Sequence, residues 1–189
     1  MQRELVERAI EGDHDAFSVL VRASLSRLYA VANLILRDGD RAEDAVQDAL
    51  ILAWRDVRAL RNPDAWEAWL HRLTVRACYQ LARRDRRRIV VELQVEPHSE
   101  TAGGADMTVA HAERERMQGE LGRLAMDQRV VMVLHFYLDL PLTEAADILD
   151  IPVGTAKSRL HRGLEALRAS LRAEPDAAVG AGLAREPLS

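Results

Sequence analysis

Residues 142–171 read LTEAADILDIPVGTAKSRLHRGLEALRASL, and this stretch decides the fold of the C-terminal part of the chain. The apolar residues of its first segment share one helix face: Leu142, Ala145, Ala146 and Leu149. The sequence Asp150-Ile151-Pro152 then turns the chain, because proline cannot continue a helix. From Val153 to Leu171 a second apolar stripe steps by three or four residues, which is typical of one helix face. The stretch therefore predicts two helices packed across a tight turn, a helix-turn-helix.

The other face of the second helix is basic and polar. It carries Thr155, Lys157, Ser158, Arg159, His161 and Arg162, all of which can donate hydrogen bonds to phosphates or base edges. A recognition helix places such residues in the DNA major groove. Asp150 stands where such turns usually have glycine, and aspartate tolerates the left-handed conformation better than most residues. We predict a duplex-DNA reader, and the alternative is a helical hairpin with a solvated basic face.

Several classes of protein are excluded by what the sequence lacks. Cys78 is the single cysteine, and no His/Cys spacing indicates a metal site, so we expect no disulfide, metal or cofactor. No nucleophile with a base and no glycine-rich phosphate loop is found, so we do not expect an enzyme. The charged N-terminus resembles no signal peptide, and the apolar run at 130–138 is too short to span a bilayer. We expect a cytoplasmic protein without membrane insertion.

The net charge of −4 hides two basic blocks. Residues 51–90 carry 10 basic and 4 acidic side chains, and residues 152–172 carry 5 and 1. Between them, residues 91–127 carry 3 basic and 8 acidic side chains. This distribution favours two anion-binding surfaces joined by an acidic connector, and charges scattered over solvated faces are the alternative.

Apolar stripes of helical spacing run through most of the chain and predict an all-α fold. We expect helices near residues 3–10, 15–37, 40–60 and 63–88, with Asp40 capping the third and Asn62-Pro63 starting the fourth. The stripe over 120–138 contains breaks, and helices follow at 142–149 and 153–171. We predict two small helical domains, 1–90 and 109–173, the second ending in the helix-turn-helix. A flexible acidic linker at 91–108 would join them, and 174–189 would be a disordered tail.

The first basic block lies at the end of the fourth predicted helix. Arg76, Tyr79, Gln80 and Arg83 are three or four residues apart and can share one surface, which the arginine run at 83–88 extends. Trp66 and Trp69 open the same helix. Basic groups beside aromatic rings suit separated bases, which stack on the rings while arginine holds the backbone. For Trp66 we expect a place in the core, and for the arginine run a solvated helix end is the alternative.

The third predicted helix carries an acidic face with apolar neighbours. Glu43, Asp44, Gln47 and Asp48 lie away from its core stripe, and Leu50, Ile51 and Trp54 extend the surface. An acidic and apolar face favours a protein partner over DNA, and a solvated face is the alternative.

With these features together, the chain resembles the extracytoplasmic-function (ECF) sigma factors, small two-domain initiation factors of bacterial RNA polymerase. The resemblance lies in LTEAADILDIPVGTAKSRLHRGLEAL (142–167), LAMDQRVVMVLHFYLDLPL (124–142), AEDAVQDALILAWRDV (42–57) and WLHRLTVRACYQLARRDRR (69–87). The segment GTAKSRLHR (154–162) is the most specific of these. Arg76 and Gln80 stand where the family often has Asn and Asp, and Ala125 stands where proline is common.

The resemblance implies a sigma factor that binds core polymerase, reads the minus-ten and minus-thirty-five promoter elements and aids strand opening. The β′ clamp helices would meet Asp44, Gln47, Asp48, Ile51 and Trp54. The minus-ten element would meet Arg76, Tyr79, Gln80, Arg83, Arg84, Arg86 and Arg87. The minus-thirty-five element would meet Thr155, Lys157, Ser158, Arg159, His161 and Arg162. The β flap would pack near 130–138, and an anti-sigma factor is a further candidate partner.

A second functional class is a stand-alone helix-turn-helix regulator, which usually binds a palindrome as a dimer. Such a regulator gives no reason for the first basic block or for the acidic linker. Binding to core polymerase would separate the two classes.

Overall fold

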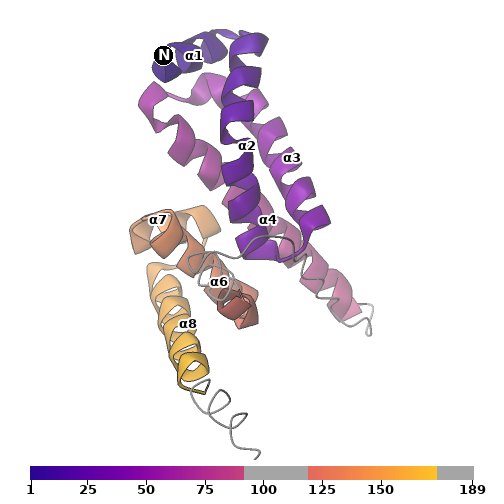
Figure 1. Cartoon of the computed structure of the whole chain (residues 1–189), viewed down its shortest axis with the longest axis vertical. Coiled ribbons are helices and arrows are strands. Elements are labelled where there is room, and N and C mark those ends of the chain that lie inside the picture. The colour runs from indigo at the N-terminus through magenta and orange to yellow at the C-terminus, as the bar shows by residue number, and fades with distance from the viewer. Residues whose placement is uncertain (92–118, 174–189) are drawn as a thin grey trace, which may run out of the picture.

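The computed structural model describes residues 1–91 and 119–173, with side chains for 1–85 and 119–172. Every regular element in these ranges is a helix, as the apolar stripes predict (Figure 1). The N-terminal bundle comprises α1 (Gln2–Glu11), α2 (His14–Leu36), α3 (Gly39–Asp56), η1 (Val57–Ala59), η2 (Pro63–Ala65) and α4 (Trp66–Val91). The C-terminal bundle comprises a helical turn at 119–123, α6 (Met126–Met132), η3 (Val133–Tyr137), α7 (Leu142–Leu149) and α8 (Val153–Ala173). The predicted tail and, apart from Val91, the predicted linker lie outside the described residues.

The start of α3 differs from the prediction by two residues. Asp38, and not Asp40, is the N-cap, and its Oδ1 accepts a hydrogen bond from the backbone N–H of Arg41 at 3.1 Å. Arg37 ends α2 in the left-handed conformation, with φ at 57°. The chain therefore turns one residue before Asp38. Asp40 already lies in the first helical turn, where a carboxylate interacts favourably with the positive end of the helix dipole.

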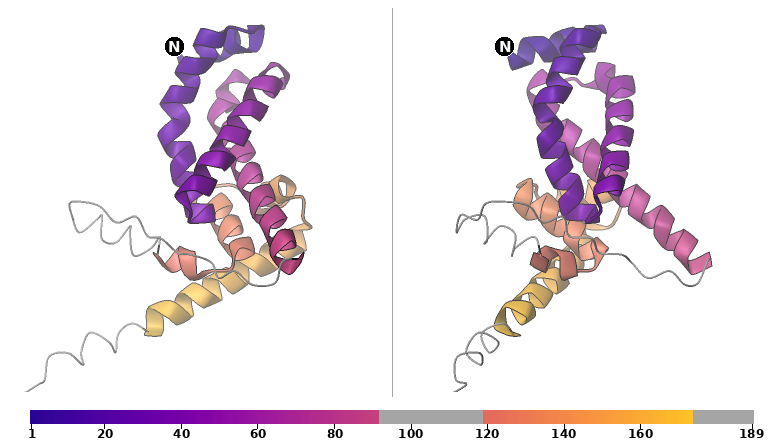
Figure 2. Two further views of the ribbon diagram at one scale, coloured as in Figure 1. Left: turned by 90° about the vertical axis from the view of Figure 1, so that its right-hand side faces the viewer. Right: turned by 45° about the vertical axis from the view of Figure 1, so that its right-hand side comes forward.

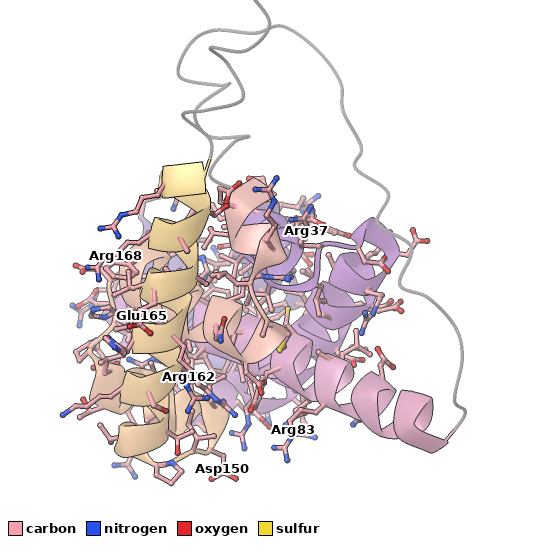
Figure 3. All side chains as sticks on the ribbon, turned by 90° about the horizontal axis from the view of Figure 1, so that it is seen from below. Arg37, Arg83, Asp150, Arg162, Glu165 and Arg168 are labelled. Carbon is pink, nitrogen blue, oxygen red and sulfur yellow. The ribbon has the colours of Figure 1, made fainter. Side chains whose placement is uncertain are left out.

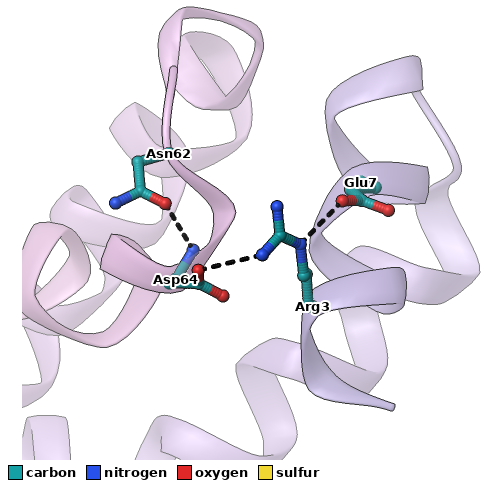
Figure 4. A network of polar contacts seen from close by, with 4 residues as sticks. All are labelled: Arg3, Glu7, Asn62 and Asp64. Carbon is teal, nitrogen blue, oxygen red and sulfur yellow. Dashed lines mark hydrogen bonds and ion pairs between the residues drawn. The ribbon is translucent and has the colours of Figure 1, made fainter.

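The start of α4 follows the predicted signal at Asn62-Pro63. Asn62 Oδ1 accepts from the backbone N–H of Asp64 at 3.0 Å, and Pro63 occupies the first position of η2 (Figure 4). Asp64 also pairs with Arg3 at 3.1 Å, and Arg3 pairs with Glu7 at the same distance along α1. These exposed pairs place α1 beside η2 but add little stability, because water screens them.

The core of the N-terminal bundle lies where α2, α3 and α4 pack together (Figures 1 and 2). The predicted stripe of α3 is buried: Ala42, Ala45, Val46, Ala49, Ala53 and, in η1, Val57. Trp66 is 1% exposed, and its ring meets that of Phe17 nearly at right angles, with 5.8 Å between centroids. Trp66 is thus a core residue, as the sequence analysis expects, and it does not stack on a base.

By length and composition alone, α2 is apolar enough to cross a membrane. The sequence-based prediction considered only the apolar run at residues 130–138 and did not include this helix. Core helices pass the same test, so the finding is weak evidence for a span. The buried residues of α2 are Ala16, Phe17, Leu20, Ser24, Leu28, Val31, Ala32, Ile35 and Leu36. All but Ser24 belong to the hydrophobic core, so we assign α2 as a core helix.

A π-helical turn explains the broken stripe at 120–138. The residues of η3 form five-residue turns, and the N–H of Leu138 donates to the carbonyl of Val133 at 3.1 Å. The wider turn shifts which residues face inward. Phe136 and Tyr137 are consequently 58% and 53% exposed, whereas Val133 and Leu134 are buried.

Arg129 on α6 is a buried cation that joins the two bundles. Its guanidinium donates to the carbonyls of Leu121 (3.0 Å), Gly122 (2.9 Å) and Leu124 (2.9 Å) in its own bundle, and of Ile35 (2.7 Å) in α2. Burial lowers the pKa of Arg129 to about 10, and the nearby positive charge of Arg37 acts in the same direction. The four carbonyls compensate the lost hydration, so the guanidinium remains charged at neutral pH.

We expect Arg129→Lys to lower the free energy of unfolding by about 2–4 kcal/mol, measured by urea denaturation. Lysine keeps the charge, but its single ammonium group cannot reach four carbonyls in the geometry of a guanidinium. Arg61→Lys, at an exposed position, is the matched control and should leave stability unchanged. Equal stabilities for the two variants would contradict the structural role of Arg129.

Candidate nucleic-acid interface

The helix-turn-helix forms as predicted, with Asp150 as its pivot. Asp150 adopts the left-handed conformation (φ 53°, ψ 52°) at the end of α7, and the N–H of Ile151 donates to the carbonyl of Ala146 at 3.1 Å. The carbonyl of Pro152 accepts from the N–H of Thr155 at 2.8 Å, which starts α8. Ala146 is fully buried, and such a small side chain allows the two helices to approach closely.

The predicted recognition face of α8 is accessible over most of its length. Lys157, His161 and Arg162 are exposed. The hydroxyl of Ser158 donates to the carbonyl of Thr155 at 2.9 Å, and both residues are half-buried. In Figure 3, Arg162 and Arg168 extend from α8 at different heights along the helix.

Arg159 behaves differently from the rest of this face. Its side chain is only 19% exposed. Nη1 donates to the hydroxyl of Tyr79 on α4 at 3.2 Å, and Nη2 lies 3.4 Å from Oδ2 of Asp127 on α6. Arg159 therefore has partners on both bundles.

The predicted basic surface of α4 is partly exposed. Arg76, Gln80, Arg83 and Arg84 are exposed, whereas Tyr79 is only 5% exposed. The Arg83 guanidinium lies over the Tyr79 ring, 5.7 Å from its centroid. The side chains of Arg86 and Arg87 lie outside the described residues. In Figure 3, Arg83 and Arg162 lie on the side of the molecule where α4 and α8 meet.

The predicted protein-binding face of α3 forms one wall of an open groove. Ile51 and Trp54 are 60% and 40% exposed, and with Gln47 they line this groove of about 780 Å³. Asp44 and Asp48 are exposed beside it. This face therefore combines exposed apolar side chains with carboxylates.

The second wall of the groove comes from α2, and the sequence analysis did not include it. Its residues are His14, Phe17, Ser18, Val21, Arg22, Leu25 and Tyr29. The rings of His14 and Phe17 meet Trp54 edge-on, with centroids 5.0 and 4.9 Å away. The apolar stripe of α2 is wider than its contact with the core requires. This extra apolar width is the sequence signal that could have predicted the second wall of the groove.

The residues that the structure describes do not indicate a metal or redox centre. No group of three His, Cys, Asp or Glu side chains there is arranged to hold a metal ion. Burial raises the pKa of the Cys78 thiol to about 12, so the group remains protonated and unreactive.

Comparisons with known proteins agree with this arrangement. Residues 20–88 match the family "Sigma-70 region 2", and residues 114–167 match "Sigma-70, region 4". The chain is 31% identical over 160 residues to the ECF RNA polymerase sigma factor SigM of Mycobacterium tuberculosis, covering 84% of this chain and 79% of that protein. The chain belongs to the ECF sigma factors. It is also 30% identical over 173 residues to the sigma-E factor of Escherichia coli, covering 86% and 90% of the two chains.

A solved structure of a sigma factor has the same fold. The sigma factor RpoE of Bartonella quintana, in complex with the anti-sigma factor NepR, aligns with a TM-score of 0.60 and 26% identity, covering 84% of this chain and 98% of that chain. The region 2 match spans most of α2, all of α3 and most of α4, and the region 4 match contains α7 and most of α8. The predicted family and all-α fold are thus confirmed, and the stand-alone regulator is not favoured.

We expect Asp150→Gly to raise the free energy of unfolding by about 0.5–1 kcal/mol, because glycine adopts the left-handed conformation without strain. Thermal or urea denaturation measures the change. Asp147→Gly, at an exposed site inside α7, is the matched control and should destabilise by about 1 kcal/mol. If both substitutions destabilise the protein equally, the turn at Asp150 is not strained.

Proposed function

We propose that the chain directs core RNA polymerase to promoters by reading two DNA elements with two separate surfaces. The observation that carries the proposal is the division of basic residues between the region 2 and region 4 segments, on α4 and α8. The assigned domains are 1–90 for core and minus-ten binding and 109–173 for minus-thirty-five binding. Binding to two elements suits a subunit that must fix the polymerase in one register on DNA.

In this proposal, α8 enters the major groove of the minus-thirty-five element. Lys157 and Arg162 are exposed in the first half of α8, the part of a recognition helix that contacts base edges and phosphates. The exposed Arg76, Gln80, Arg83 and Arg84 of α4 contact the minus-ten element, together with Tyr79, Arg86 and Arg87. Aromatic and arginine side chains hold separated bases without requiring a duplex, which suits the strand-opening step.

The groove between α2 and α3 is the proposed site for core polymerase. It combines apolar side chains, such as Ile51 and Trp54, with the exposed carboxylates of Asp44 and Asp48. Aromatic anchors surrounded by a charged rim are typical of protein interfaces. The assigned partner is the pair of β′ clamp helices, and the β flap is assigned to the region around 130–138, where Phe136 and Tyr137 are exposed.

The proposal assigns binding and no chemical step to this chain. It acts in the cytoplasm with polymerase, and it uses no cofactor. An anti-sigma factor is a further proposed partner, by analogy with the RpoE structure, which contains NepR. The decisive experiment is in vitro transcription with bacterial core polymerase and a randomised promoter library. Transcripts that start downstream of one recurrent pair of elements support the proposal, and the absence of chain-dependent transcripts overturns it.

We expect Arg162→Ala to weaken binding of the full chain to its minus-thirty-five duplex by about tenfold, as loss of one specific contact does. Fluorescence anisotropy at several salt concentrations measures this, and the salt slope should fall by about one if the contact is to a phosphate. Arg168→Ala removes another exposed arginine, six residues further along α8, and is the control. Equal losses for both variants would remove the assignment of the recognition face.

We expect Asp48→Arg to weaken binding to core polymerase by at least about tenfold, because the new charge opposes the partner that the carboxylate attracts. Glu11→Arg is the control, since Glu11 is an exposed acid at the end of α1, and it should leave core affinity unchanged. Binding to the minus-thirty-five duplex should be retained in both variants. Loss of core and DNA binding together would indicate misfolding.

A further inference from the structure

The helices α6 and α8 of the C-terminal bundle pack closely against each other (Figures 1 and 2). Gly163 on α8 is buried at this contact. A Cβ atom at Gly163 would lie only 2.8 Å from the sulfur of Met132 on α6, so a side chain there would displace Met132 or push the helices apart. The absence of a side chain at this position therefore allows the two helices to approach closely.

The close approach places an acidic residue of α6 beside a basic residue of α8. Asp127 lies in the first turn of α6. Arg159 lies four residues before Gly163 and so on the same side of α8, because residues four apart in a helix are neighbours. Nη2 of Arg159 is 3.4 Å from Oδ2 of Asp127. This contact is formed entirely within the C-terminal bundle.

The pair of Asp127 and Arg159 is more shielded from water than a typical surface ion pair. The Arg159 and Asp127 side chains are 19% and 28% exposed, compared with 61% and 51% for the exposed pair of Arg3 and Glu7. Solvent and salt screen a partly buried pair less than an exposed one. At 3.4 Å the attraction is mainly between charges, and it is strong enough in this setting to restrict where the guanidinium lies.

We propose that Asp127 is a positioning residue for DNA reading, which holds the Arg159 guanidinium in the orientation that meets the minus-thirty-five element. The inference rests on the proposed function, because it takes Arg159 as a DNA-contacting residue. A guanidinium has five N–H donors, and the contact with Asp127 occupies one of them. The remaining donors are sufficient for a bidentate contact with the edge of a guanine, which needs two.

Orientation matters more for reading a sequence than for attraction to DNA. A phosphate attracts any nearby cation whatever the sequence, whereas a base edge is recognised only by donors at fixed positions. Arginine has a long and flexible side chain, and a partner that fixes it before binding reduces the entropy that is lost on binding. Asp127 therefore adds to discrimination between sequences, while its negative charge opposes the general attraction to DNA.

Neutralising Asp127 separates these two effects, because they have opposite signs. Fluorescence anisotropy measures the affinity of the full chain for two duplexes. One carries the minus-thirty-five element recovered from the randomised library, and the other carries the same bases in scrambled order. We expect Asp127→Asn to lower the ratio of specific to scrambled affinity by about three- to tenfold, as weakening one base contact does. Affinity for the scrambled duplex should stay unchanged or rise, because a negative charge has been removed.

Three further variants test whether the effect passes through Arg159. In the Arg159→Ala background, Asp127→Asn should no longer change the ratio. Asp127→Glu keeps the carboxylate and should retain most of the discrimination. Asp147→Asn makes the same charge change at an exposed site of α7, and as the matched control it should leave the ratio unchanged. Thermal denaturation of each variant reports the contribution of Asp127 to the start of α6, where a carboxylate also interacts with the helix dipole.

The positioning role is overturned if Asp127→Asn leaves the ratio unchanged, as Asp147→Asn does, or lowers it equally in the Arg159→Ala background. It is also overturned if Arg159→Ala itself leaves the ratio unchanged. A lower melting temperature with equal losses of affinity for both duplexes would show that Asp127 only stabilises α6, and would reject the role too.

Failure of the proposed function has a different signature. In that case the natural chain binds the two duplexes equally, and Arg162→Ala changes neither affinity. If Arg162→Ala lowers the ratio while Asp127→Asn behaves like its control, the promoter-reading function stands and the positioning role of Asp127 alone is rejected.

Discussion

The arrangement of this protein depends on where one buried guanidinium finds its hydrogen-bond partners. Arg129 cannot lose its charge at neutral pH, and water is largely excluded from it, so carbonyl oxygens must replace its hydration. Three of these oxygens belong to the turn at 121–124, which fixes that turn against α6. The fourth, from Ile35, comes from the C-terminal end of α2, where helix carbonyls lack intrahelical partners. One side chain thus closes a turn within one bundle and completes the end of a helix in the other.

The other contacts between the bundles have a different character. They include the partly exposed pair of Arg72 with Glu144 and the largely buried hydrogen bond from Arg159 to Tyr79, beside an apolar core that residues of both bundles share. An obligate interface buries a larger apolar surface, and a separable one is more polar. The polar contacts fix an orientation without adding a large free energy.

Periodicity predicted the helices well, because an apolar stripe is a local property of the sequence. It predicted the helix-turn-helix at Asp150 and the face of α8, since both follow from spacing and turn chemistry. It failed at the start of α3, where Asp38 and Asp40 were equally good candidates for the N-cap. It also failed at η3, where a π-turn breaks the helical period. It also missed that α2 forms the second wall of the groove beside Trp54. That pairing depends on tertiary packing, which a stripe on one helix does not specify.

The burial of Tyr79 and Arg159 was the least predictable feature, because both are residue types that favour exposure to DNA. The structure brings the guanidinium groups of Arg83 and Arg159 to the same tyrosine, with the Asp127 carboxylate 3.4 Å from Arg159. Two like charges near one ring repel each other, and a polyanion supplies the missing counter-charge. DNA phosphates can therefore compete for Arg159 more effectively than a neutral hydroxyl can, since hydrogen bonds between charged partners are stronger.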